Sequence, residues 1–297
     1  MKRLFAPAIA AVLLTACAGI TAPGATKSQT PQQGLASSAN AMGQLKSARF
    51  DVNGTVNITL PQALVDQLKA KGGSQAAILT TNMTVTLKIN GAAQKPDHLQ
   101  ATVSAKLGGL TLNTEVIALG GTVYYKDPMT SRWAVLKRPS TTEPKAAAPK
   151  LSYQTILDTA KSVTELTANP ATLNNVTVEQ YRIVPDLAKL FAAISARNSG
   201  TTSPAMTALQ TVLQNANVSA DVWTGKDDHL VRRVSYDADL TGDLSQLLAG
   251  MTPPTATSKA PAFSLPAGSI AHLTAHVVVD LHDFNTAIKI VAPTVGS

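Results

Sequence analysis

A strict alternation of apolar and polar residues recurs along this 297-residue chain and limits the folds that it can adopt. Over residues 50–60, every even position except Gly54 carries a large apolar residue, and every odd position is polar. Nearly the same period of two returns over residues 82–90, 98–107 and 270–283. Because successive side chains of a β-strand point to opposite sides, this period predicts strands with one apolar and one solvated face.

The rest of the pattern adds shorter strands and a few helices. Further strands are expected over residues 110–119, 122–126, 133–137, 176–184, 218–224 and 230–240. Helical spacing of apolar residues predicts short helices over residues 35–45, 153–163, 187–194 and 206–213. Since the early strands follow one another without a helix between them, they favour antiparallel pairing over parallel βαβ units. The expected fold is α+β, a large curved antiparallel sheet of about ten strands with short helices against one side.

The first seventeen residues have the parts of an export signal. Lys2 and Arg3 give it a positive start, and the apolar segment 4–16 is too short to cross a bilayer, which needs about 20 residues. The segment Leu14-Thr15-Ala16-Cys17 resembles the lipobox of bacterial lipoproteins, in which the cysteine receives a diacylglyceryl group and the chain is cut just before it. The resemblance implies lipidation of Cys17 and a lipid-anchored location on the extracytoplasmic face of the cell membrane.

Three regions follow from this interpretation. They are a signal peptide over residues 1–16, a flexible tether over residues 17–34 and a single folded domain over residues 35–297. The tether lacks an apolar period and is rich in small and polar residues. Cys17 is the only cysteine, so the folded part has neither a disulfide nor a thiol nucleophile. The alternative interpretation is an ordinary signal peptide that happens to contain a cysteine.

Charge and motifs argue against several functions. The net charge of +7 is dispersed, and its longest basic runs are the pairs Lys137-Arg138 and Arg232-Arg233, so no nucleic-acid partner is expected. The sequence contains no G-x-S-x-G, P-loop, G-x-G-x-x-G or H-E-x-x-H motif. We therefore expect neither a cofactor nor an enzyme, while a hydrolase whose active site has no known motif remains an alternative.

Three histidines on one side of the last predicted strand raise the question of a metal site. His272, His276 and His282 share that side with Asp280, and imidazole and carboxylate groups are zinc ligands. Along an extended strand, however, His272 and His276 would lie about 13 Å apart, too far for one ion. We expect no metal site and interpret these residues as solvent-facing polar positions. The segment Asp227-Asp228-His229 is expected to form a hairpin loop.

Three segments and the order of the predicted elements resemble one family of lipoproteins. The segments are residues 121–133, residues 222–234 and residues 277–293, the last an apolar run that ends in Asp283-Phe284. They are similar to the LppX and LprA/LprF/LprG lipoproteins of mycobacteria and their relatives, which share a half-barrel related to the LolA and LolB lipoprotein carriers. In layout the resemblance spans residues 35–293.

The resemblance implies a half-barrel whose concave apolar face, roofed by short helices, forms a cavity for lipid or glycolipid acyl chains. Such a protein carries or presents lipid across the cell envelope, with a membrane transporter as a candidate partner. The candidate cavity residues are Val52, Val56, Ile58, Val85, Leu87, Ala101, Val103, Leu112, Ile156 and Leu190. The alternative is a non-catalytic envelope lipoprotein with a solid core that acts through a protein partner. Residues 61–77 depart from the family layout and are expected to form an extra cover helix or lid.

Overall fold

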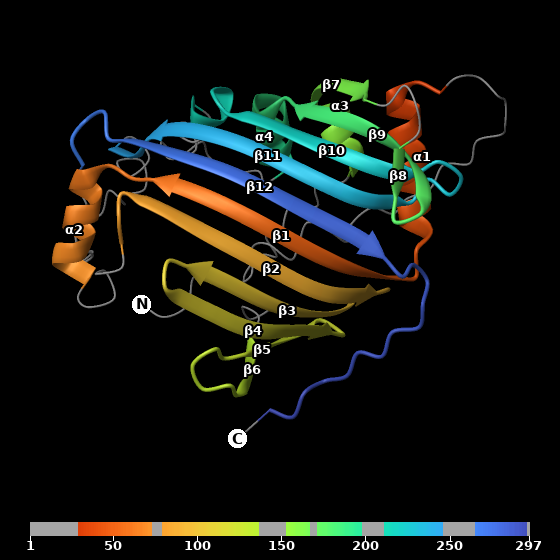
Figure 1. The fold of residues 1–297 in the computed structure, drawn as a ribbon, viewed down its shortest axis with the longest axis horizontal. Helices are drawn as coiled ribbons and strands as arrows, with labels where there is room; N and C mark the ends of the chain where they lie inside the picture. The colour runs from red at the N-terminus through yellow and green to blue at the C-terminus, as the bar shows by residue number, and fades with distance from the viewer. Residues whose placement is uncertain are drawn as a thin grey trace. The chain divides into compact units, whose positions relative to one another are not determined.

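The computed structural model describes residues 29–72, 79–136, 153–166, 171–197, 211–245 and 265–295. These residues form twelve strands of one sheet (Figure 1). The strands are β1 (Ser47–Thr59), β2 (Asn82–Gln94), β3 (His98–Leu107), β4 (Leu110–Leu119), β5 (Thr122–Lys126), β6 (Trp133–Leu136), β7 (Ala160–Glu165), β8 (Ala171–Leu173), β9 (Val176–Pro185), β10 (Asn217–Gly225), β11 (Val231–Asp243) and β12 (Ile270–His282). Their order is β6-β5-β4-β3-β2-β1-β12-β11-β10-β9-β7, and β8 pairs with β9.

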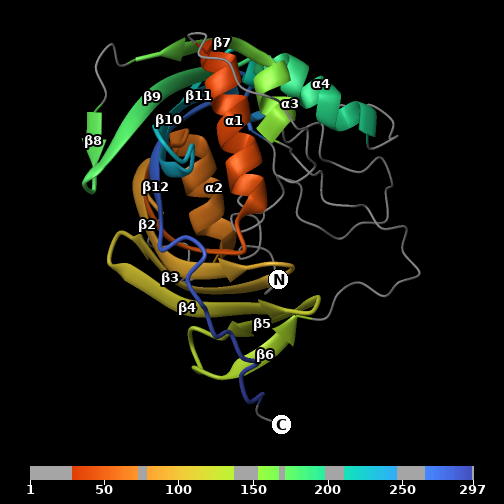
Figure 2. The same ribbon diagram turned by 90° about the vertical axis from the view of Figure 1, so that its right-hand side faces the viewer.

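The predicted fold class is confirmed, with twelve strands in place of about ten. Strands β1, β2 and β3 pair in sequence order, and β12 returns to pair with β1 on its other side, so residues far apart in sequence become neighbours. All of these pairs are antiparallel. The sheet is open, because β6 and β7 lie at opposite ends of the strand order. Figure 2 shows β3 and β4 turning away from the direction of β12 and β2, so this part of the sheet is curved.

Four helices that the structure describes over their full length accompany the sheet, and residues 211–214, at the end of the helix predicted over residues 206–213, are also helical. The four helices are α1 (Pro31–Gln44), α2 (Gln62–Gly72), α3 (Tyr153–Asp158) and α4 (Leu187–Arg197). The helix α1 begins at a capping box, in which the Thr30 hydroxyl accepts from the Gln33 amide and the Gln33 side chain accepts from the Thr30 amide. In the part of the chain that the structure describes, no helix is long and apolar enough to cross a bilayer.

Within residues 61–77, for which the sequence predicts an extra cover helix or lid, residues 62–72 form a helix, and residues 73–77 lie outside the described residues. This helix is α2, which connects β1 to β2 and stands at the end of the sheet where β1 ends (Figure 1). Figure 2 places α2 on the concave side of the curved sheet formed by β12, β2 and β3. Its Val65 side chain is only 1% exposed, so the helix is held by burial of that side chain.

The predicted helix over residues 153–163 is wrong in its second half. The helix α3 ends at Asp158, and the chain continues as β7, in which Val163 lies opposite Ile183 of β9. The β-branched residues Val163 and Thr164 suit a strand better than a helix. Pairing with β9 therefore outweighs the helical spacing of the apolar residues that precede them.

Two turns show how local chemistry fixes the chain between strands. The short strand β8, which the alternation does not predict, is joined to β9 by Asn174 and Asn175 with φ values of 50° and 63°. Asparagine tolerates this left-handed region better than most residues, so the Asn-Asn pair is the signal that identifies this hairpin. The predicted loop after β10 is confirmed, since the Asp228 carboxylate accepts a 3.0 Å hydrogen bond from the Leu230 amide.

The chain forms two compact units. The first consists of Met1–Leu45, Pro139–Ser199 and Asp221–Arg232, and the second of Lys46–Arg138, Gly200–Ala220 and Arg233–Ser297. The first unit holds α1, α3 and α4 with β7, β8 and β9. The second unit holds β1 to β6, β12, most of β11 and the helix α2.

A close approach between α1 and β9 organises the first unit. The Tyr181 ring lies directly against Gly34, where a larger residue would collide with the phenol. The Tyr181 hydroxyl donates a 2.6 Å hydrogen bond to the Glu179 carboxylate. Burial, reinforced by this carboxylate, raises the pKa of Tyr181 above its ordinary value. Tyr181 and Leu35 are both buried, and the hydrogen bond to Glu179 satisfies the buried phenol.

Candidate functional site

The register of six neighbouring strands aligns their apolar residues on one side of the second unit. Val52 lies opposite Val279 on β12 and Ile89 on β2, and Ile89 lies opposite Val103 on β3. Residues directly opposite each other in an antiparallel pair point to the same side. The apolar face therefore comprises the even positions of residues 48–58, 110–118 and 234–242 and the odd positions of residues 83–93, 99–107 and 271–281.

The apolar face is almost entirely hydrocarbon. Among its residues, only Thr114 and Tyr236 have a side chain that contains oxygen, and no residue has one that contains nitrogen. The Thr114 hydroxyl donates a 2.6 Å hydrogen bond to the backbone carbonyl of Lys126 on β5. The apolar face therefore offers a continuous aliphatic wall across β11, β12, β1, β2, β3 and β4.

One part of the apolar face is covered and another part is not. Where β1 begins, the side chains are buried, and they belong to Phe50, Val52, Ile89, Ala101 and Val279. Toward the hairpin between β3 and β4, Leu110 is 44% exposed and Leu112 is 40% exposed. A sheet packed solidly against its cover would bury these leucines as it buries Val52. The apolar face is thus open at one end.

Gly54 forms a gap in the middle of the apolar face. An ideal Cβ atom at this position would lie 3.3 Å from a Val277 methyl group and 3.7 Å from the Leu87 Cβ atom, the side chains on the two adjacent strands. These are ordinary or slightly tight contacts, and they come only from the sides. Gly54 therefore leaves a trough between Val277 and Leu87.

The second glycine on this face behaves differently. At Gly91, the Phe50 ring occupies the space that a Cβ atom would take, and the Gln100 carbonyl oxygen lies 2.7 Å from that position. Phe50 is itself buried. One glycine thus accommodates a neighbouring aromatic ring, and the other leaves the face open.

The structure brings eight of the ten predicted cavity residues together on the apolar face. They are Val52, Val56, Ile58, Val85, Leu87, Ala101, Val103 and Leu112. Ile156 on α3 and Leu190 on α4 belong to the first unit, and both are partly buried there. Cys17 lies outside the described residues. Sequence reasoning did not single out Gly54 or Tyr236, although both occupy positions of the same period-two pattern.

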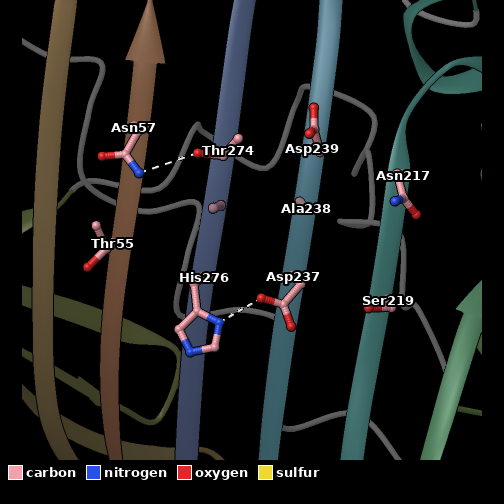
Figure 3. A pocket seen from close by; sticks show the side chains of 10 residues that line it. Thr55, Asn57, Asn217, Ser219, Asp237, Ala238, Asp239, Thr274 and His276 are labelled. Carbon is pink, nitrogen blue, oxygen red and sulfur yellow. Dashed lines mark hydrogen bonds and ion pairs between the residues drawn. The ribbon is translucent and has the colours of Figure 1, made fainter.

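The opposite face of the same strands is polar. It bears a groove of about 280 Å³ lined mainly by hydroxyl, amide, carboxylate and imidazole groups of β1, β12, β11 and β10 (Figure 3). A second groove, of about 320 Å³, lies on the same face beside Ile288 and Lys289 of the C-terminal segment. Most of the residues that line the two grooves have polar side chains, which distinguishes them from the aliphatic wall on the other side.

The three histidines of β12 are solvent-facing, as predicted, and each also pairs with a carboxylate on this polar face. His276 contacts Asp237 at 2.7 Å, as Figure 3 shows. His272 contacts Asp239 at 2.8 Å, and His282 contacts Asp51 at 3.1 Å. Each pair joins β12 to a neighbouring strand. In the described ranges, no cluster of metal-ligating side chains has the geometry to hold an ion.

Comparison with known proteins gives similar solved structures but no sequence match. No family model matches the chain, and no curated protein does. LppX, a lipoprotein of Mycobacterium tuberculosis, is 11% identical, with 88% of this chain and 97% of that chain covered and a TM-score of 0.40. LprF from Mycobacterium bovis is 13% identical, with 90% of this chain and 97% of that chain covered and a TM-score of 0.43. A LolA superfamily protein from Nitrosomonas europaea is 7% identical, with 88% of this chain and 96% of that chain covered and a TM-score of 0.23.

Proposed function

We propose that this chain binds the acyl chains of lipids or glycolipids on the apolar face of its second unit. The observation that carries the proposal is the aliphatic wall across six paired strands, which stays partly exposed at Leu110 and Leu112. Acyl chains have no hydrogen-bonding groups, and each methylene that leaves water gains about 0.8 kcal/mol. A wide hydrocarbon surface is the complementary partner for such a ligand.

The open end of the face favours a ligand over a solid core. Large exposed apolar surfaces are costly in water and usually mark a binding surface. The trough at Gly54 supplies a place where a chain can lie between the Val277 and Leu87 side chains. The buried end near Phe50 gives the sheet the packed core that it needs to keep this shape.

The proposal includes the anchor and the location. Lipidation of Cys17 would hold the chain at the extracytoplasmic face of the cell membrane, and two acyl chains are enough for stable attachment. From there the protein would carry or present lipid across the envelope, with a membrane transporter as a candidate partner. The alternative role, as a surface for a protein partner, uses the same exposed leucines and is an outcome of the experiment below.

We propose a binding role without catalysis. The two oxygen-containing side chains of the apolar face, those of Thr114 and Tyr236, have no carboxylate or imidazole beside them on that face. A hydroxyl nucleophile needs an adjacent general base to become reactive. The His–Asp pairs lie on the other side of the sheet, where they join neighbouring strands.

An acidic substitution on the open end tests where the ligand lies. We expect Leu112→Asp to weaken binding of a pyrene-labelled fatty acid about tenfold, because it removes a leucine contact of roughly 1.5 kcal/mol and adds a charge. The matched control is Thr111→Asp, which places the same charge on the polar face of the same strand. The measurement is a fluorescence titration of the purified chain without residues 1–17. Equal affinities of the two variants for the fatty acid would contradict the proposed location. If the wild-type chain binds no lipid but pulls down a protein, the result would favour the alternative role as a surface for a protein partner.

A further inference from the structure

Among the six strands of the apolar face, one phenol is present, and it lies on β11, the strand at one edge of these six. The Tyr125 phenol lies on the same side of the adjoining strand β5, opposite Val116. Tyr236 of β11 is directly opposite Val277 of β12, and Val277 is in turn opposite Gly54. Its neighbours on the same side of β11 are Val234 and Ala238. A polar group on an otherwise hydrocarbon face can offer a bound ligand a hydrogen bond that its neighbours cannot.

The two hydroxyls of the apolar face differ in how they are satisfied. Thr114 donates to the Lys126 carbonyl within the sheet, so its hydrogen atom is already used. The Tyr236 hydroxyl makes no hydrogen bond to any of the residues that the structure describes. The residue is 37% exposed, so a ligand on the face can reach it. The phenol is thus a free donor beside the trough.

The surroundings keep this group in its donor form. Partial desolvation of the side chain raises the pKa of Tyr236 above the ordinary tyrosine value of about 10, so the phenol stays protonated throughout the physiological range. A protonated phenol donates one hydrogen bond, and the ligand groups that accept one are carbonyl and carboxylate oxygens. Fatty acids and acyl esters carry such an oxygen at the end of the hydrocarbon chain.

We propose that Tyr236 donates a hydrogen bond to the carbonyl or carboxylate oxygen of a bound acyl lipid, so that the face selects acyl lipids over plain hydrocarbons. The inference rests on the proposed function and adds a specificity-determining residue to it. Tyr236, Val277 and Gly54 lie in one row across three adjacent strands, with about 4.8 Å between neighbours. The acyl oxygen would meet the phenol at one side of the trough, and the hydrocarbon chain would continue over Gly54.

Removing only the hydroxyl tests this inference. We expect Tyr236→Phe to weaken binding of pyrene-dodecanoic acid about three- to tenfold, the effect of one hydrogen bond in a poorly solvated site. Binding of pyrene-dodecane, which has the same chain but no oxygen, should stay within twofold of wild type because the ring is retained. The matched control is Tyr124→Phe, which removes a phenol from the opposite side of β5 and should change neither affinity.

The two probes separate this inference from the proposed function. If wild-type chain binds neither probe, lipid binding itself is wrong. If wild type binds both probes and Tyr236→Phe binds the acid as tightly as wild type does, the hydrogen bond is wrong while the lipid site stands. Equal weakening of both probes would also overturn the inference, because it would indicate a change of packing and not the loss of a donor. Thermal unfolding of each variant shows whether the fold is intact.

Discussion

Gly54→Trp is expected to weaken fatty-acid binding roughly thirtyfold while the protein still folds. The indole would fill the trough between Val277 and Leu87, and the acyl chain would lose about three methylene contacts there, worth about 2 kcal/mol. The backbone at Gly54 does not have a positive φ, so a larger residue brings no backbone strain. The measurement is a fluorescence titration of the purified variant beside a thermal unfolding curve.

Two further substitutions control this experiment. Asn53→Trp places the same indole at the adjacent position, whose side chain lies on the polar face of the sheet. This variant should leave fatty-acid binding unchanged. Gly54→Ala adds a single methyl group that meets the Val277 side chain at 3.3 Å, and we expect nearly normal binding. If Gly54→Trp folds and binds fatty acid as wild type does, the trough is not part of the ligand site.

Gly91→Ala is expected to cost about 1–3 kcal/mol of folding free energy, the usual penalty for overpacking a core. The new methyl group would collide with the Phe50 ring and would lie 2.7 Å from the Gln100 carbonyl oxygen. The ring can move only by leaving its buried site, and the carbonyl belongs to the paired strand β3. The loss should appear as a lower urea midpoint and a lower melting temperature.

Gly109→Ala is the matched control for the stability experiment. A Cβ atom at Gly109 meets no other atom within 4 Å, so this substitution should leave stability within about 0.5 kcal/mol of wild type. If Gly91→Ala were as stable as Gly109→Ala, the contact between Phe50 and Gly91 would not hold the closed end of the face.

Much of the sheet is predictable, because the alternation of apolar and polar residues within each strand determines which side chains share a face of the whole sheet. The predicted bounds of residues 110–119 and 122–126 coincide with β4 and β5. A period of two places every second side chain on one face, so the shared side of Val56, Val85 and Leu112 follows once the strands pair in register. The end of α3 at Asp158 was not predictable in this way, because the pairing of β7 with β9 is a tertiary interaction.

The openness of the site could not be predicted from the sequence. Gly54 and Gly91 are the same residue type on the same face of neighbouring strands, and only Gly91 has the Phe50 ring and the Gln100 carbonyl oxygen against it. The exposure of Leu112 likewise depends on what covers the sheet. Tyr236 gave a partial signal, since it shares the even positions with Val234 and Leu240, but an aromatic residue there fits a packed core equally well.

Extraction of lipid from the purified protein is the most direct test of the central claim. The wild-type chain, expressed with its signal and purified from the membrane, would be compared with a chain that lacks residues 1–17 and is purified from the soluble fraction. Mass spectrometry of the organic extracts should detect acyl lipid with both proteins, and pyrene-labelled fatty acid should bind the emptied chain saturably at about micromolar or lower concentration. Absence of lipid from both extracts, together with no saturable uptake of the fatty acid, would contradict the account.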